Sequence, residues 1–91
     1  RRDLARTRSV KTVRWTPEAL RDMRRLDPQV ARQIRDAVER YAATEQGDVK
    51  KLRAPEFGFR LRVGDWRVRF LPQHPDTIIV FRVRHRSEAY R

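Results

Sequence analysis

The chain of 91 residues has no cysteine, only three glycines and two histidines, and about half as many acidic as basic residues. Without cysteine there can be no disulfide framework, no thiolate metal site and no cysteine nucleophile. A cytoplasmic location, in a reducing cytosol, fits this composition. His74 and His85 are too isolated in sequence to predict a zinc site, so we expect no metal.

Long apolar runs and glycine-rich loops are missing as well. The longest uninterrupted apolar run covers residues 78–81. A membrane-spanning helix needs roughly 20 such residues, so we expect no membrane partner. Neither a glycine-rich phosphate loop nor a Ser-His-Asp arrangement is readable, and we therefore expect no cofactor.

Basic charge is abundant and unevenly distributed. Lysine and arginine number 23 against 12 aspartates and glutamates, a net charge of +11. Residues 1–48 hold 12 basic and 8 acidic side chains, whereas residues 49–91 hold 11 basic and 4 acidic ones. Such an excess predicts a polyanionic partner, most often nucleic acid, although a merely soluble basic domain is the plain alternative.

Two helices are predicted in the first half, after a short strand over residues 9–15. Thr16-Pro17 and Asp27-Pro28 each combine an N-cap residue with proline at the first helical position. Gly47 is expected to end the second helix. The apolar stripes at helical spacing are Leu20, Met23 and Leu26 in the first helix, and Val30, Ile34, Ala37, Val38 and Tyr41 in the second.

Residues 59–70 predict a β-hairpin. They alternate apolar residues with arginine on both sides of Gly64-Asp65, and glycine in the first position suits a type II′ turn. This register pairs Arg62 with Arg67 and Arg60 with Arg69 on one face. Directly opposed like charges destabilise a sheet by a few tenths of a kcal/mol to about 1 kcal/mol each, so this face is suited to an anion.

A third consecutive strand is predicted over residues 77–84, while residues 48–58 are irregular. The alternation in this last strand is imperfect, because Ile78 and Val80 fall on the same side as Arg82, Arg84 and Arg86. The order is therefore β-α-α-β-β-β, an α+β fold with a helical hairpin on one face of a small antiparallel sheet. We expect one domain over residues 10–91 and a flexible basic tail over residues 1–9.

A basic surface of this kind can bind RNA and could cleave it without metal. RNA supplies its own nucleophile, the 2′-hydroxyl, so cleavage needs in-line positioning, charge neutralisation and proton transfer. Arginine does the first two well, but its pKa above about 12 prevents it from acting as a base. The base must then come from another side chain, for which the candidates are Lys50, Lys51, Glu56, His85 and Tyr90.

Three segments resemble the RelE toxins of bacterial type II toxin–antitoxin systems. They are Lys51-Leu52-Arg53, the hairpin 59–68, and Val83-Arg84-His85-Arg86-Ser87-Glu88-Ala89-Tyr90, within a resemblance over about residues 10–90. The resemblance implies a microbial RNase-like fold and a metal-independent endoribonuclease, an mRNA interferase that enters the ribosomal A site and leaves a 2′,3′-cyclic phosphate. It also implies a cognate antitoxin that covers the basic face.

The resemblance also assigns residues. Catalytic positions map onto Arg60, Arg62, Arg67, Arg84 and Tyr90, and we expect RNA-binding support from Lys50, Lys51, Arg53, Arg69, Arg82, His85 and Arg86. Well-studied members have lysine where Arg60 and Arg62 stand, which removes the simplest candidate for a base. Two alternatives stay open: a ParE-like toxin that inhibits DNA gyrase, and a non-catalytic nucleic-acid-binding domain.

Overall fold

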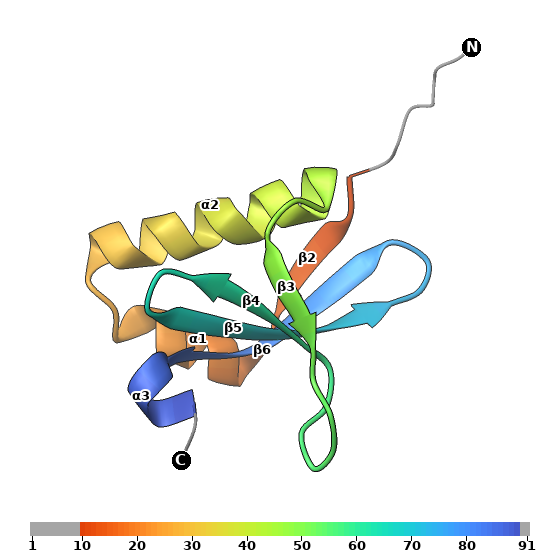
Figure 1. Cartoon of the computed structure of the whole chain (residues 1–91). Helices are drawn as coiled ribbons and strands as arrows, with labels where there is room; N and C mark the ends of the chain where they lie inside the picture. Colours follow the sequence, from red (N-terminus) through yellow and green to blue (C-terminus); the bar gives the residue numbers. More distant parts are fainter. Residues whose placement is uncertain (1–9, 90–91) are drawn as a thin grey trace.

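A computed structural model describes residues 10–89, so the expected tail 1–9 and Tyr90 lie outside the described residues. Its elements are β2 (Thr12–Trp15), α1 (Pro17–Arg24), α2 (Pro28–Thr44), β3 (Asp48–Lys51), β4 (Phe59–Val63), β5 (Trp66–Gln73), β6 (Thr77–His85) and α3 (Arg86–Ala89). The five strands form one curved sheet in the order β2-β6-β5-β4-β3 (Figure 1).

The predicted α+β architecture is confirmed, with three differences. The sheet is mixed, because β2 runs parallel to β6 while the other neighbours are antiparallel. Part of the segment expected to be irregular forms the edge strand β3, which pairs with β4. A short helix, α3, which was not predicted, follows β6.

Both predicted helix starts are confirmed. The Thr16 hydroxyl accepts a hydrogen bond from the Ala19 amide at 3.1 Å, and the Asp27 carboxylate accepts one from Gln29 at 2.8 Å. These caps satisfy amides that have no partner within the helix. The expected end of α2 at Gly47 is wrong, because the helix stops at Thr44 and Glu45 takes the left-handed conformation with φ 62°.

The core lies between α2 and one face of the sheet. Its buried residues are Ala19, Ile34, Val38, Ala42, Leu61, Val68, Phe70, Ile78, Val80 and Val83. Leu20 was expected there but is 46% exposed, since α1 turns Ala19 and Asp22 inward instead. Tyr41 packs against Phe70, and this burial raises the pKa of its hydroxyl above the usual 10.0.

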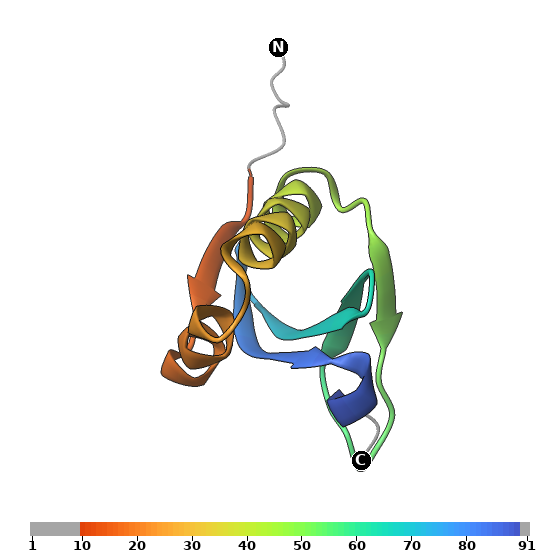
Figure 2. The ribbon, with the colours of Figure 1, turned by 90° about the vertical axis from the view of Figure 1, so that its left-hand side faces the viewer.

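Helix α1 covers the part of β6 that extends beyond β2. β2 pairs with β6 only as far as Val80, where the Thr16 amide donates to the Val80 carbonyl at 2.9 Å. The chain then turns into α1, which packs against the remaining edge of β6 (Figure 2). No helix within residues 10–89 is both long and apolar enough to cross a membrane.

The hairpin β4–β5 has the predicted register. Arg62 pairs with Arg67 and Arg60 with Arg69. Gly64 has φ +58° and Asp65 does not have a positive φ, as a type II′ turn requires.

A β-bulge in β6 explains the imperfect alternation of its sequence. Phe70 pairs with Val80 but Arg69 pairs with Arg82, so Phe81 is an extra residue on β6. The bulge reverses the alternation, and Val80 therefore faces the core while Arg82 lies on the opposite face. The expectation that Ile78 and Val80 share a side with the arginines is wrong for this reason.

Candidate nucleic-acid interface

The face of the sheet opposite the core carries six arginines in two rows. Cross-strand partners share a face, so the register defines each row. The Arg67 row consists of Asp48, Arg62, Arg67 and Arg84, and the Arg69 row consists of Lys50, Arg60, Arg69 and Arg82. Together the two rows form the arginine face. In each row, the two opposed arginines predicted in the hairpin are joined by a third arginine from β6.

A pocket of about 140 Å³ lies at the centre of this face. It is lined by Leu52, Glu56, Arg60, Arg67, Arg69, Arg82 and Arg84. Five guanidinium groups around so small a space form a site for an oxyanion such as phosphate.

Arg67 is the most buried of these arginines, with 6% of its surface exposed. Its Nη1 donates to the carbonyl oxygens of Gly64 at 3.0 Å and Trp66 at 3.1 Å, both at the hairpin turn. Its Nε is buried without a hydrogen-bond partner in the described part of the chain, where no carboxylate forms an ion pair with it either. A buried cation that only neutral carbonyls hold in place favours an anionic ligand.

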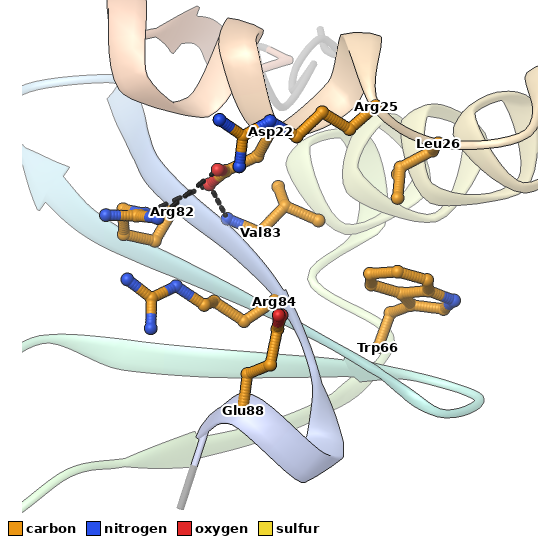
Figure 3. Close-up of a pocket in the computed structure, with 8 residues that line it drawn as sticks. All are labelled: Asp22, Arg25, Leu26, Trp66, Arg82, Val83, Arg84 and Glu88. Atoms are coloured by element: carbon orange, nitrogen blue, oxygen red, sulfur yellow. Dashed lines mark hydrogen bonds and ion pairs between the residues drawn. The ribbon is translucent and has the colours of Figure 1, made fainter. Parts of the chain in front are cut away.

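Arg82 is held by a carboxylate from α1. Its Nε lies 3.0 Å from Asp22 Oδ2 and its Nη2 lies 3.3 Å from Oδ1, while the same carboxylate accepts the Val83 amide at 2.8 Å (Figure 3). Asp22 is only 8% exposed. It therefore joins α1 to the free edge of β6 and fixes one guanidinium of the arginine face. No local pattern in the sequence marks this residue as part of the site.

Arg84 lies beside Arg82 but has no such partner. The two side chains extend from the same side of β6, and Trp66 lies on the other side (Figure 3). Arg84 is half-buried, and no ion pair of residues 10–89 involves it. Both arginines also line a larger pocket of about 490 Å³ at the edge of β6, where α1 and α3 supply Asp22 and Glu88.

The loop between β3 and β4 delivers a carboxylate and an aromatic ring to the arginine face. It is closed at its base by a hydrogen bond from the Leu52 amide to the Gly58 carbonyl at 2.9 Å. Glu56 from this loop lines the central pocket. Phe57 stacks on Phe81, the bulged residue of β6, with ring centroids 5.2 Å apart. Phe57 was not predicted as a site residue. The signal that could have identified it is an aromatic residue in a loop that also contains proline and glycine.

Five of the predicted site residues meet in the central pocket: Arg60, Arg67, Arg69, Arg82 and Arg84. Arg62 and Lys50 share the face but do not line the pocket, and Arg62 has an exposed ion pair with Asp48 at 3.9 Å. Arg53 is exposed in the loop.

The other predicted residues lie elsewhere. Lys51 pairs with Phe59 and His85 pairs with Trp66, which places both on the core side of the sheet. The His85 ring contacts Trp66 edge-on, and its Nδ1 accepts the Ser87 amide at 3.2 Å. Arg86 belongs to α3 and lies 3.8 Å from Asp65. Tyr90 is outside the described residues.

The side chains predicted as candidates for a general base lie in different places on the sheet. His85 and Lys51 lie on the side of the sheet opposite the arginine face, and Lys50 lies on the exposed edge strand. Glu56 is the carboxylate that lines the central pocket. Within residues 10–89, no three histidine, aspartate or glutamate side chains are arranged to hold a metal ion.

Comparisons with known proteins agree with this architecture. Residues 13–90 match the family described as the ParE toxin of type II toxin–antitoxin systems, parDE. No curated protein matches the chain.

Solved structures give further matches. A chain of the Mycobacterium tuberculosis RelBE2 toxin–antitoxin complex is 28% identical, with a TM-score of 0.75 over 86% of this chain and 100% of that one. A chain of the Pyrococcus horikoshii RelE–RelB complex is 20% identical, with a TM-score of 0.70 over 86% and 97%. The Agrobacterium tumefaciens YoeB/ParE toxin is 18% identical, with a TM-score of 0.67 over 81% and 96%. The expected RelE-like fold is thereby confirmed.

Proposed function

This chain belongs to the ParE toxin family of type II toxin–antitoxin systems, within the RelE/ParE superfamily, and from that premise we propose that it is a metal-independent endoribonuclease that cleaves mRNA on the ribosome. One observation carries the proposal: Glu56, Arg67 and Arg84 line the same small pocket. A carboxylate beside uncompensated arginines provides both a base and a site for the charge that develops during cleavage.

The reaction follows from the chemistry of RNA. The 2′-hydroxyl attacks the adjacent phosphorus, the bond to the 5′-oxygen breaks, and a 2′,3′-cyclic phosphate remains. Glu56 takes the proton of the 2′-hydroxyl. Arg67 and Arg84 donate hydrogen bonds to the non-bridging oxygens, whose negative charge increases in the transition state. Tyr90 is proposed, from the resemblance, to protonate the leaving 5′-oxygen.

The partners follow from the same proposal. We infer a cognate antitoxin that covers the arginine face, since two of the similar chains were solved in RelB–RelE-type complexes. The ribosomal A site would present single-stranded mRNA to this face. Expression of the chain should therefore arrest growth, and expression of the neighbouring gene should restore it.

Cleavage of mRNA on programmed ribosomes, with mapping of the new 5′ ends, tests the activity. Glu56→Gln removes the base but keeps the shape, and should lower the cleavage rate by about 10²–10⁴-fold. Arg67→Ala should lower it by about 10²–10³-fold. Arg62→Ala is the matched control, because Arg62 shares the row of Arg67 but lies outside the pocket, and it should cost less than tenfold. Intact mRNA at stoichiometric protein would contradict the proposal.

A gyrase inhibitor is the second candidate, because the matching family is described as the ParE toxin. Inhibition of DNA supercoiling without RNA cleavage would favour it. In that case Glu56→Gln should leave toxicity unchanged, since no proton transfer is involved. RNA binding without cleavage or toxicity would favour the non-catalytic alternative.

A further inference from the structure

Phe57 is an exposed aromatic residue at the border of the arginine face. It is 56% exposed, although it belongs to a loop whose base is closed by hydrogen bonding. Single exposed apolar residues are common on protein surfaces and by themselves indicate nothing. Phe57 differs because it is part of an ordered group of three side chains, with Phe81 and Arg69, that also reaches the central pocket.

The Phe57 ring is held from behind. It stacks on Phe81 with an angle of 8° between the ring planes. Arg69 Nη2 donates to the Phe57 carbonyl at 2.8 Å, so the backbone of the loop is also anchored to β5. Gly58 has φ +80°, and a Cβ atom there would lie 2.8 Å from the Phe70 carbonyl oxygen. The close approach that glycine permits fixes where Phe57 stands.

Phe81 and Arg69, the two side chains in aromatic or cation–π contact with Phe57, do not cover the outer face of its ring. The Arg69 guanidinium carbon lies 5.4 Å from the Phe57 ring centre and 5.1 Å from that of Phe81, while the two ring centres are 5.2 Å apart. These three distances form a nearly equilateral triangle, so the guanidinium lies on the same side of the Phe57 ring as Phe81. A group on the outer face of Phe57 would be much farther from Phe81. Both aromatic contacts of Phe57 therefore leave one flat surface available.

Arg69 connects this surface to the anion pocket, because it contacts the Phe57 ring and also lines the pocket. A flat aromatic face beside a phosphate-sized cationic pocket matches the two parts of a nucleotide. Proteins that bind single-stranded nucleic acid combine cationic grooves with aromatic platforms in this way. A double helix would not fit, since its bases are already stacked on one another.

We propose that Phe57, supported by Phe81 and Arg69, is a stacking platform for one unpaired RNA base whose neighbouring phosphate enters the central pocket. The inference rests on the proposed function and deepens it, because it names the part of the substrate that this loop holds. The protein then recognises its RNA by a splayed-out base as well as by charge.

The experiment measures the affinity of a short single-stranded 2′-O-methyl RNA, which cannot be cleaved, by fluorescence anisotropy at several salt concentrations. Phe57→Leu should raise the Kd by about 5- to 100-fold, because stacking is lost while apolar volume is largely kept. Phe57→Trp should bind as well as the wild type or better. The slope of affinity against salt should be the same in all three, because no charge changes. Leu20→Ala, at an exposed apolar residue of α1, is the matched control and should bind like the wild type.

A double-mutant cycle locates the base. Abasic replacements along the RNA should weaken binding to the wild type strongly at one position, and the same replacement should have little effect with Phe57→Leu. Unchanged affinity in Phe57→Leu would overturn the inference. Equal losses of RNA affinity in Phe57→Leu and Phe57→Trp would also overturn it, because they would indicate disturbed packing of the loop. So would unchanged RNA affinity with a weaker antitoxin complex.

The outcomes also separate this inference from the proposed function. RNA binding that depends on Phe57 without any cleavage on ribosomes would refute the nuclease and support the platform. Cleavage that is insensitive to Phe57→Leu, with unchanged RNA affinity, would refute the platform alone. A wild-type chain that binds no free RNA but cleaves mRNA on ribosomes would refute the platform alone, and a chain that does neither would refute both.

Discussion

The Arg67 row and the Arg69 row are neighbours with the same residue type on three adjacent strands, yet their charges are compensated differently. In the Arg69 row, Arg82 has the Asp22 carboxylate and Arg69 has the Phe57 carbonyl and two aromatic rings. In the Arg67 row, Arg67 has two neutral carbonyls, and Arg84 has no ion-pair partner in the described part of the chain. Identical side chains two residues apart on β6 therefore have different roles.

The difference separates structural from functional charge. A guanidinium paired with a buried carboxylate contributes to folding and offers less of its charge to a ligand. A guanidinium held by carbonyls keeps its full charge and is already oriented, so its interaction with phosphate has little reorganisation to overcome. Arg67 and Arg84 should therefore determine activity, and Arg82 should determine stability.

The largest expected effect is that substitution of Arg84 lowers the cleavage rate whereas substitution of Arg82 lowers stability. Arg84→Ala should lower the rate of mRNA cleavage by about 10²–10³-fold and leave the free energy of unfolding within about 0.5 kcal/mol. Arg82→Ala should lower the free energy of unfolding by about 2 kcal/mol, because it leaves the Asp22 carboxylate without its ion pair. Cleavage assays and urea unfolding measure the two quantities. Equal effects of both substitutions on both quantities would remove the distinction between the rows.

The next largest effect is expected from substitution of the Asp22 carboxylate. Asp22→Ala should lower the free energy of unfolding by about 2–4 kcal/mol, since both Arg82 and the Val83 amide lose their acceptor. Asp22→Asn keeps an acceptor for Val83 and should lose less. Asp36→Ala, at an exposed acid on α2, is the control and should change stability by no more than about 0.5 kcal/mol. A wild-type urea midpoint in Asp22→Ala would show that α1 is held in place without it.

The smallest effect concerns the acid of the Arg67 row. Asp48 and Arg62 are both more than half exposed and 3.9 Å apart, so their pair should contribute under about 1 kcal/mol to stability. Asp48→Asn removes a negative charge from the arginine face and should tighten RNA binding a few-fold at low salt. The gain should disappear as ionic strength rises. A large loss of stability would place Asp48 with Asp22 as a structural acid.

The sequence predicted what depends on near neighbours. The caps at Thr16 and Asp27 and the hairpin register around Gly64-Asp65 are set by residues within a few positions, and each is confirmed. The same register predicted that Arg60 and Arg67 share a face. Local chemistry was sufficient for these features.

Features that depend on contacts between distant segments could not be predicted from the sequence. Asp22 and Arg82 are 60 residues apart in sequence, and no local pattern distinguishes Asp22 from the other acids of the helices. Glu56 was only one candidate base among several, because the path of the loop from 52 to 58 decides that it reaches the pocket. The parallel pairing of β2 with β6 joins opposite ends of the chain, which alternation alone cannot reveal.

Because of the bulge at Phe81, the orientation of the site arginines depends on the number of residues in β6. Residues 77–80 and 82–85 of β6 alternate in opposite phase, and one additional residue between them keeps Val80 inside while Arg82 and Arg84 stay outside. A substitution at position 81 preserves that count. A deletion of one residue there would bring either two arginines into the core or Ile78 and Val80 to the surface. For this strand, an insertion or deletion of a single residue is a more severe genetic change than the replacement of any one side chain.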